Sequence, residues 1–108
     1  MIDWARVHEL RSEIGADDFG DVAALFLEEA DEVVGRLSHL TDAASMERDL
    51  HFLKGCALNL GFSELAKICQ SGERRAASGI TDIFMSDVAG VYSQSRTAFL
   101  NGMKALAA

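Results

Sequence analysis

The chain has 108 residues, which is enough for one domain with a hydrophobic core and too few for two. Seventeen acidic residues against ten basic ones give a formal net charge of −7, which argues against nucleic acids and anionic membrane surfaces as partners. The chain contains no proline and 49% of its residues are hydrophobic, so long uninterrupted helices are allowed and intrinsic disorder is not expected.

The two cysteines and the N-terminal residues indicate in which cellular compartment the protein is expected. The two cysteines, Cys56 and Cys69, match neither a disulfide framework nor the spacing of a zinc site. The N-terminal residues lack the basic segment and apolar stretch of a signal peptide, and no apolar run is long enough to cross a bilayer. We therefore expect a reduced, cytoplasmic protein with buried cysteines and with no metal or cofactor of its own.

Apolar residues recur with helical spacing along nearly the whole chain, which predicts an all-α protein. The predicted helices cover residues 4–14, 19–40, 44–60, 64–77 and 81–106. The expected N-caps are Asp3 for the first helix, Asp17 or Asp18 for the second and Ser63 for the fourth. The first, third and fourth helices are expected to end at Gly15, at Gly61 and at Ser78 with Gly79.

Each of the four longer helices has one apolar face, which we interpret as a contribution to a common core. The predicted inward residues are Val22, Phe26, Ala30, Val33, Leu37 and Leu40; Met46, Leu50, Leu53, Ala57 and Leu60; Leu65, Ile68, Cys69, Gly72 and Ala76; and Phe84, Val88, Val91, Tyr92, Phe99, Met103 and Leu106. Short connections favour antiparallel neighbours. We predict an antiparallel up-down four-helix bundle with a short additional N-terminal helix, and a single domain over residues 1–108.

The candidate functional residues lie on the third predicted helix, on the side away from its apolar face. They are His51, Lys54, Gly55 and Leu58. A glycine inside a helix costs about 1 kcal/mol relative to alanine, so Gly55 requires a reason. It lies one turn after His51, where a side chain would crowd the imidazole. Its missing Cβ leaves space for a group attached to that histidine or pressed against it.

The chemistry of these side chains suits a transient anionic adduct. A histidine is largely neutral near pH 7 and is therefore nucleophilic, and Lys54 supplies an ammonium group to the same place. A phosphoryl group attached to His51 would gain charge-assisted hydrogen bonds from that ammonium. The alternative is a solvated helix face with an incidental histidine, and the residue pattern alone leaves both interpretations open.

The segment from His51 to Gly55 resembles the His-x-Leu-Lys-Gly signature of histidine-containing phosphotransfer (HPt) domains. The residues that extend the resemblance are Gly61, Leu65, Cys69 and Glu73, together with the acidic segment from Phe26 to Glu29. It covers nearly the whole chain in the order and length of the helices. The resemblance implies that His51 accepts a phosphoryl group from a receiver-domain aspartate or a sensor kinase and passes it on.

The resemblance also implies roles for residues around His51. Lys54 would neutralise the phosphoryl oxygens, and Gly55 would give the partner's active site a clear approach. Glu73 matches a position where relatives carry Gln or Glu within reach of the imidazole, although it is also compatible with an ordinary exposed glutamate. Relatives often have a small hydroxyl residue after the glycine, where this chain has Cys56. They also often have a basic residue further along the fourth helix, a role that Arg74 or Arg75 would have to fill.

The implied partners are a response-regulator receiver domain and a sensor or hybrid histidine kinase, with the protein acting as a monomer. The receiver is expected to supply the aspartate and a divalent metal. A chain of this size has no room for an ATP site, so it is not expected to make its own phosphohistidine from ATP. Two other functions remain open at this stage. One is a non-catalytic helical interaction module, and the other is a detached phosphoacceptor domain of a chemotaxis-type kinase.

Overall fold

The protein is all-helical in its computed structural model, which describes residues 1–107. The helices are α1 (Trp4–Ile14), α2 (Ala16–Arg36), α3 (Ala43–Leu60), α4 (Ser63–Ala77) and α5 (Met85–Ala107), with a short 3₁₀ helix η1 (Leu37–His39) after α2. Extended pairing within these residues is limited to a single bridge between Ile2 and Phe62. Between residues 1 and 107 there is no helix with the length and hydrophobicity needed to span a membrane.

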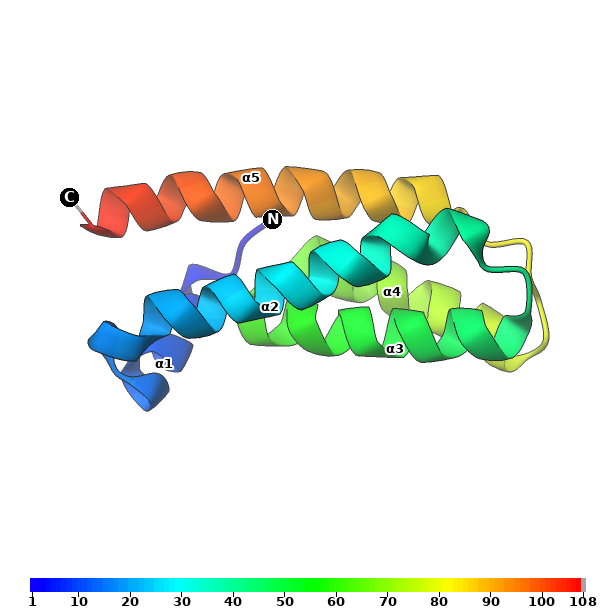
Figure 1. Cartoon of the computed structure of the whole chain (residues 1–108), viewed down its shortest axis with the longest axis horizontal. Helices are drawn as coiled ribbons and strands as arrows, with labels where there is room; N and C mark the ends of the chain where they lie inside the picture. Colours follow the sequence, from blue (N-terminus) through cyan, green and yellow to red (C-terminus); the bar gives the residue numbers. More distant parts are fainter. Residues whose placement is uncertain (108) are drawn as a thin grey trace.

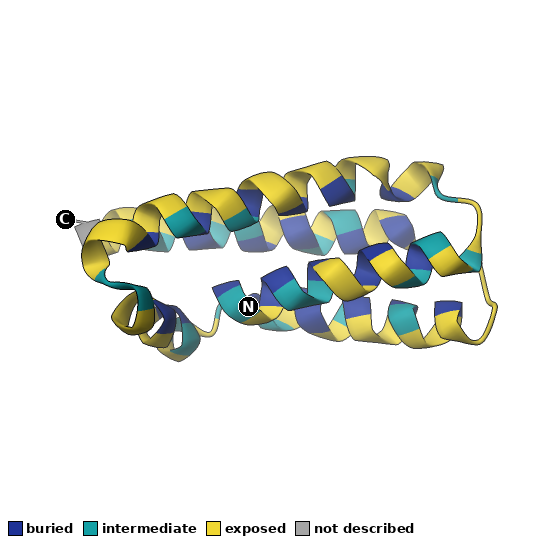
Figure 2. Ribbon diagram, turned by 60° about the horizontal axis from the view of Figure 1, so that its bottom comes forward, coloured by how far each residue is buried: buried dark blue, intermediate teal, exposed yellow. Residues whose placement is uncertain are grey.

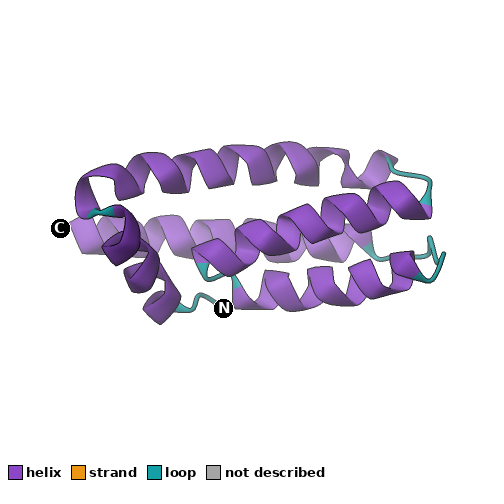
Figure 3. Cartoon of the chain, turned by 90° about the horizontal axis from the view of Figure 1, so that it is seen from below, coloured by secondary structure: helices purple, strands orange, loops and turns teal. Residues whose placement is uncertain are grey.

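The four longer helices lie side by side, and successive ones are connected at opposite ends of the molecule (Figure 1). Helix α3 packs against α2 and α4, and α5 packs against α4 and α2. The short α1 lies at one end, where it contacts α2 and α3 (Figure 3). The particle is elongated, with principal extents of 45 × 22 × 20 Å.

The core lies along the axis between these helices, and each helix turns one buried face toward it (Figure 2). All five residues predicted to face inward on α3 are buried, and on α4 only Ile68 is half-buried. The largest fully buried side chains are Phe62, Phe99, Leu37, Leu50, Leu53, Leu60 and Leu65. The helical period alone was therefore enough to identify the inward faces of α3 and α4.

The prediction for α2 was wrong at both ends and for the inward residues of its first half, whereas Ala30, Val33 and Leu37 are buried as predicted. The helix begins at Ala16 directly after Gly15, whose φ of 102° turns the chain between α1 and α2. Asp17 and Asp18 lie in the first turn, where a carboxylate interacts favourably with the helix dipole, and neither is the N-cap. The α-helix ends at Arg36, before η1.

Two adjacent apolar rows on α2 explain the error in its first half. The row that is buried contains Phe19, Ala23, Leu27, Ala30 and Val33. Val22 and Phe26, which were predicted to face inward, belong to the neighbouring row and are half-buried, as is Leu40 beyond η1. A sequence period identifies an apolar face but does not decide which of two adjoining rows meets the other helices.

The start predicted for the last helix, at residue 81, was also too early. Helix α5 begins at Met85, because residues 78–84 are needed to carry the chain from α4 across to α5. Ile83 packs against α4 at Gly72, whereas Phe84, predicted to face inward, is 69% exposed. Leu106 is likewise exposed, near the end of α5.

The N-terminal segment binds the turn between α3 and α4 through backbone hydrogen bonds. The amide of Asp3 donates to the carbonyl of Gly61 at 2.7 Å, and the amide of Ser63 donates to the carbonyl of Met1 at 3.2 Å. Ser63 is therefore the first residue of α4 and not its cap, which is Phe62 without a side-chain hydrogen bond. Gly61 has a φ of 75°, and a Cβ there would lie 2.6 Å from the Asp3 carbonyl oxygen. Both the conformation and the close approach require glycine.

Helices α3 and α4 approach each other closely at Gly72. A Cβ at this position would lie 2.9 Å from Cδ1 of Leu50, which is fully buried and has little room to move. The missing side chain lets the backbone of α4 come up against α3 halfway along both helices. Glu73, the next residue, is thereby brought within reach of the outer face of α3.

Asp49 is a charged residue that is buried in the interior of the fold. Its side chain is 2% exposed and accepts two hydrogen bonds from Arg36, at 2.8 Å to Nε and 3.0 Å to a terminal nitrogen. The hydrogen bond from Arg36 holds the pKa of Asp49 below its ordinary value, although burial acts in the opposite direction. This pair joins the end of α2 to α3 two residues before His51.

We predict that Asp49→Asn lowers the free energy of unfolding by about 2 kcal/mol at pH 7, because Arg36 loses its charged acceptor. The lowered pKa of Asp49 means that its contribution is present above the ordinary aspartate pKa and is lost as the pH falls through the lowered one. The difference between wild type and variant should therefore persist down to about pH 5 and shrink below about pH 4. Urea unfolding across this range measures it. Asp21→Asn, an exposed change on α2, is the control and should stay within about 0.5 kcal/mol.

Candidate functional site

His51 lies in the middle of α3 with its side chain 69% exposed. Its Nδ1 atom lies 2.6 Å from Oε2 of Glu73, on the neighbouring helix α4. An ionised carboxylate can only accept hydrogen bonds, so Nδ1 carries the hydrogen of the neutral imidazole. The lone pair of that tautomer is then on Nε2, the nitrogen that is not bonded to Glu73.

Glu73 connects the histidine to the lysine. Its Oε1 atom accepts a hydrogen bond of 2.7 Å from the ammonium of Lys54, while Oε2 is bonded to His51. Burial raises the pKa of Glu73, but the hydrogen bonds from Lys54 and His51 outweigh that effect and keep the pKa below its ordinary value. With a side chain only 17% exposed, Glu73 is not the ordinary surface glutamate that the sequence also allowed.

Lys54 is held more tightly than a surface lysine. Its side chain is 22% exposed, and its ammonium lies between the two helices on the same side of α3 as His51. A lysine at this position covers the turn before it, because side chains on a helix lean toward the N-terminus. The three side chains His51, Lys54 and Glu73 form one hydrogen-bonded cluster, with Glu73 at its centre.

Gly55 borders this cluster but does not touch it. A Cβ built on Gly55 would meet no heavy atom within 4 Å. The prediction that a side chain at position 55 would crowd the imidazole of His51 is therefore wrong for the Cβ atom of that side chain. The fold itself does not require glycine at this position, because the space that the first atom of a side chain would occupy is empty of other protein atoms.

Two shallow hollows flank His51. One is lined by Ala44, Glu47, Arg48 and Glu73, and the other by Phe26, Glu29, Phe52, Gly55, Cys56 and Asn59. Phe52 is 42% exposed and Leu58, further along α3, is 57% exposed. The imidazole thus stands between a charged hollow and a more apolar one.

Several of these neighbours were not identified as site residues from the sequence. Arg48 and Phe52 lie beside His51 at helical spacings, so their proximity could have been read from the α3 period. Phe26 and Glu29 come from α2, and no local spacing connects them to His51. Asn59 donates to the Gly55 carbonyl at 2.9 Å and accepts from Arg6 of α1 at 3.2 Å, a contact across more than fifty residues that only the folded chain reveals.

Arg74 and Arg75 are not brought to His51. Successive residues on a helix are turned by about 100°, so both side chains leave α4 on another side from Glu73. They line a separate surface with Lys67, Gln70 and Ser71. The structure provides no support for either arginine as a partner of the imidazole.

The cysteines are buried, as expected. Burial raises the pKa of Cys56 to about 11 and that of Cys69 to about 12, so both remain thiols near neutral pH. Residues 1–107 contain no group of three or more His, Cys, Asp or Glu side chains that could hold a metal ion.

Comparison with known proteins matches this arrangement to one family. The sequence model described as the Hpt domain matches residues 21–106, from the first turns of α2 to the end of α5. Searches of curated proteins and of solved structures found no match. The matched segment covers nearly all of the chain and includes the whole cluster of His51, Lys54 and Glu73. The chain belongs to the Hpt domain family, whose role is histidine phosphotransfer in two-component signalling.

Proposed function

We propose that His51 is the phosphoacceptor of a phosphorelay module, which takes a phosphoryl group from a receiver-domain aspartate or a sensor kinase and transfers it to a receiver domain. The observation that carries this proposal is the hydrogen bond between Nδ1 of His51 and Glu73. It holds the ring by one nitrogen and leaves the other, Nε2, with its lone pair available on an exposed side chain.

The transfer is an in-line displacement at phosphorus. The Nε2 lone pair forms the N–P bond while the bond from phosphorus to the aspartyl oxygen breaks, and the aspartate leaves as a carboxylate. The imidazole, which keeps its hydrogen on Nδ1, becomes positively charged. The Glu73 carboxylate, 2.6 Å away, stabilises that charge. Transfer to a receiver is the same step in reverse, and the receiver is expected to hold the divalent metal.

Lys54 is the cation of this cluster, and we assign it to the phosphoryl oxygens. Its ammonium is bound to Glu73 in the free protein and has further donors, which we assign to the oxygens of a phosphoryl group on His51. We infer that the longer helices form an antiparallel four-helix bundle, as their contacts and connections indicate. The module is proposed to act as a single monomeric domain that presents His51 on the outer face of α3 to a receiver domain or a histidine kinase.

The first prediction from this proposed function concerns the acceptor. Incubated with a phosphorylated receiver, or with a kinase and receiver together, the protein should gain label that is labile to acid and stable to alkali. His51→Gln should gain none, while His39→Gln, a change at another exposed histidine, should be labelled as wild type. Label that persists in His51→Gln would move the acceptor elsewhere. Failure of the wild type with every receiver of its source would favour a non-catalytic interaction module.

The second prediction separates the roles of Glu73 and Lys54. Glu73→Ala removes the acceptor of Nδ1–H, so His51 should populate both tautomers and the transfer rate should fall by roughly tenfold. Nitrogen-15 NMR of the imidazole measures the tautomers directly. Lys54→Ala should slow transfer or shorten the lifetime of phosphohistidine while keeping the Nδ1–H tautomer. A tautomer ratio that is unchanged in Glu73→Ala would contradict the positioning role.

The third prediction concerns Gly55. Gly55→Leu should keep or raise the melting temperature, because alanine-like helix propensity is gained and a Cβ meets no atom within 4 Å. The leucine side chain would lean over the preceding turn and cover His51, so transfer should be blocked. Gly90→Leu on α5 is the control, since that position is also open and should leave transfer unaffected. Normal transfer by Gly55→Leu would remove the argument that glycine provides access.

A further inference from the structure

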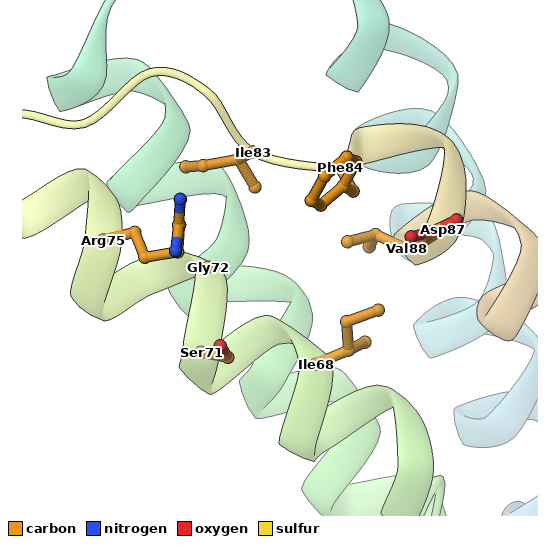
Figure 4. A pocket seen from close by; sticks show the side chains of 8 residues that line it. All are labelled: Ile68, Ser71, Gly72, Arg75, Ile83, Phe84, Asp87 and Val88. Carbon is orange, nitrogen blue, oxygen red and sulfur yellow. The ribbon is translucent and has the colours of Figure 1, made fainter.

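A second exposed feature lies on the side of α4 that faces away from His51. A hollow of about 160 Å³ is formed between α4 and the start of α5, with Ile68, Ile83, Phe84 and Val88 as its apolar lining. Figure 4 shows Ile68 and Val88 on two sides of this space, with Ile83 and Phe84 at one end. An apolar cavity of about 150 Å³ can hold a benzene ring, so the hollow is large enough for one aromatic or leucine side chain.

Two large apolar side chains at or near the hollow are exposed, whereas Val88 in its wall is buried and Ile68 and Ile83 are half-buried. Phe84 is 69% exposed and Ile80, in the same connection between α4 and α5, is 40% exposed. The core does not need Phe84, because Ile83 fills the position against Gly72. Large apolar side chains that gather beside a hollow mark a place where another molecule could bury them.

The rim of the hollow on α4 is basic. Lys67, Arg74 and Arg75 occur at helical spacing and line an adjoining surface that shares Ser71 and Arg75 with the hollow. None of the three forms an ion pair within residues 1–107, although most of the other cations described there do. Arg75 makes only a hydrogen bond to the carbonyl of Asp82, at 3.3 Å. In a chain with a net charge of −7, this is a local concentration of uncompensated positive charge.

We propose that this surface, the α4–α5 hollow with its rim of Lys67, Arg74 and Arg75, binds an acidic peptide segment of a partner protein that carries one aromatic or leucine anchor. The anchor fills the hollow against Ile68, Phe84 and Val88, and the acidic residues pair with the rim. Asp87, on the wall opposite α4, directs the acidic part of the segment toward the α4 side. The anchor requirement distinguishes such a segment from a nucleic acid, whose charge alone would suit the rim.

The position of this surface allows it to act together with the His51 site. Glu73 leaves α4 toward α3, whereas Arg74 and Arg75 follow at turns of about 100° and 200° around the helix. A protein docked over His51 therefore leaves the hollow accessible. An acidic segment tethered to a partner could occupy the hollow while the partner's folded domain uses His51, which raises the effective concentration of that domain.

The test uses the whole chain and a short synthetic peptide of glutamate and serine residues with one central phenylalanine. Two-dimensional NMR titration should shift the amides of residues 67–75 and 80–88 and leave those around His51 unchanged. Phe84→Ser and Arg74→Glu should each weaken binding by at least about fivefold. Both side chains are exposed, so both variants should keep the wild-type melting temperature. Binding should also weaken when salt is raised, because the rim is exposed to solvent.

Matched controls distinguish binding at this surface from nonspecific binding of the peptide. Arg11→Glu changes an exposed cation that has no ion pair within residues 1–107, and Leu100→Ser changes an exposed leucine of α5; both should bind the peptide within about twofold of wild type. A peptide with alanine in place of phenylalanine should bind at least about fivefold more weakly. The proposal is overturned if the peptide does not bind, if the anchor makes no difference, or if the shifts map to the His51 face. It is also overturned if the hollow is occupied by a second copy, seen as a dimer that Phe84→Ser dissociates.

Discussion

The close contact between α3 and α4 is the constraint on which the site depends. Two glycines make it possible: Gly61 turns the chain with a positive φ beneath the Asp3 carbonyl, and Gly72 brings the backbone of α4 onto Leu50. Glu73 follows Gly72 directly, so the same contact carries its carboxylate to the outer face of α3. Without that approach Glu73 could not bond to His51 at 2.6 Å and to Lys54 at 2.7 Å at once. The packing of the core therefore fixes the orientation of an exposed imidazole.

Other contacts hold α3 on both sides of His51 and keep it in register. Asp49 is bound by Arg36 near the end of α2, and Asn59 is bound by Arg6 of α1. Both contacts lie within eight residues of His51, one on each side. Buried or partly buried hydrogen bonds of this kind resist rotation of a helix more specifically than apolar packing does, because they are lost when the donor and acceptor move apart. A nucleophile that must meet a partner in line benefits from such a fixed platform.

The sequence predicted the helices and the inward faces of α3 and α4 because their apolar residues follow one helical period. It predicted Asp3 as a cap and Gly61 as a turn because these residues have specific backbone chemistry, and both are found in those roles. It failed where packing chooses between equivalent patterns: between two apolar rows on α2, and between Ile83 and Phe84 at the start of α5. His51, Lys54 and Gly55 were recognised by local spacing, whereas Glu73 was proposed only from a family resemblance. Phe26 and Glu29 border the site through contacts between distant segments, which no local pattern contains, and the hydrogen bond between Asn59 and Arg6 is of the same kind.

The charge balance of the cluster fits the proposed role of a carrier better than that of a permanent phosphate site. In the free protein the ammonium of Lys54 is already paired with Glu73, and the two charges cancel. A phosphoryl group brings roughly two negative charges to His51, and Lys54 must then be shared between that group and the carboxylate. A cation shared in this way stabilises the phosphoryl group less than a free one would. Under the proposed function, the Glu73 carboxylate that holds the ring in place for attack would also limit how firmly the phosphorylated product is held, so the phosphoryl group would stay available for the next transfer.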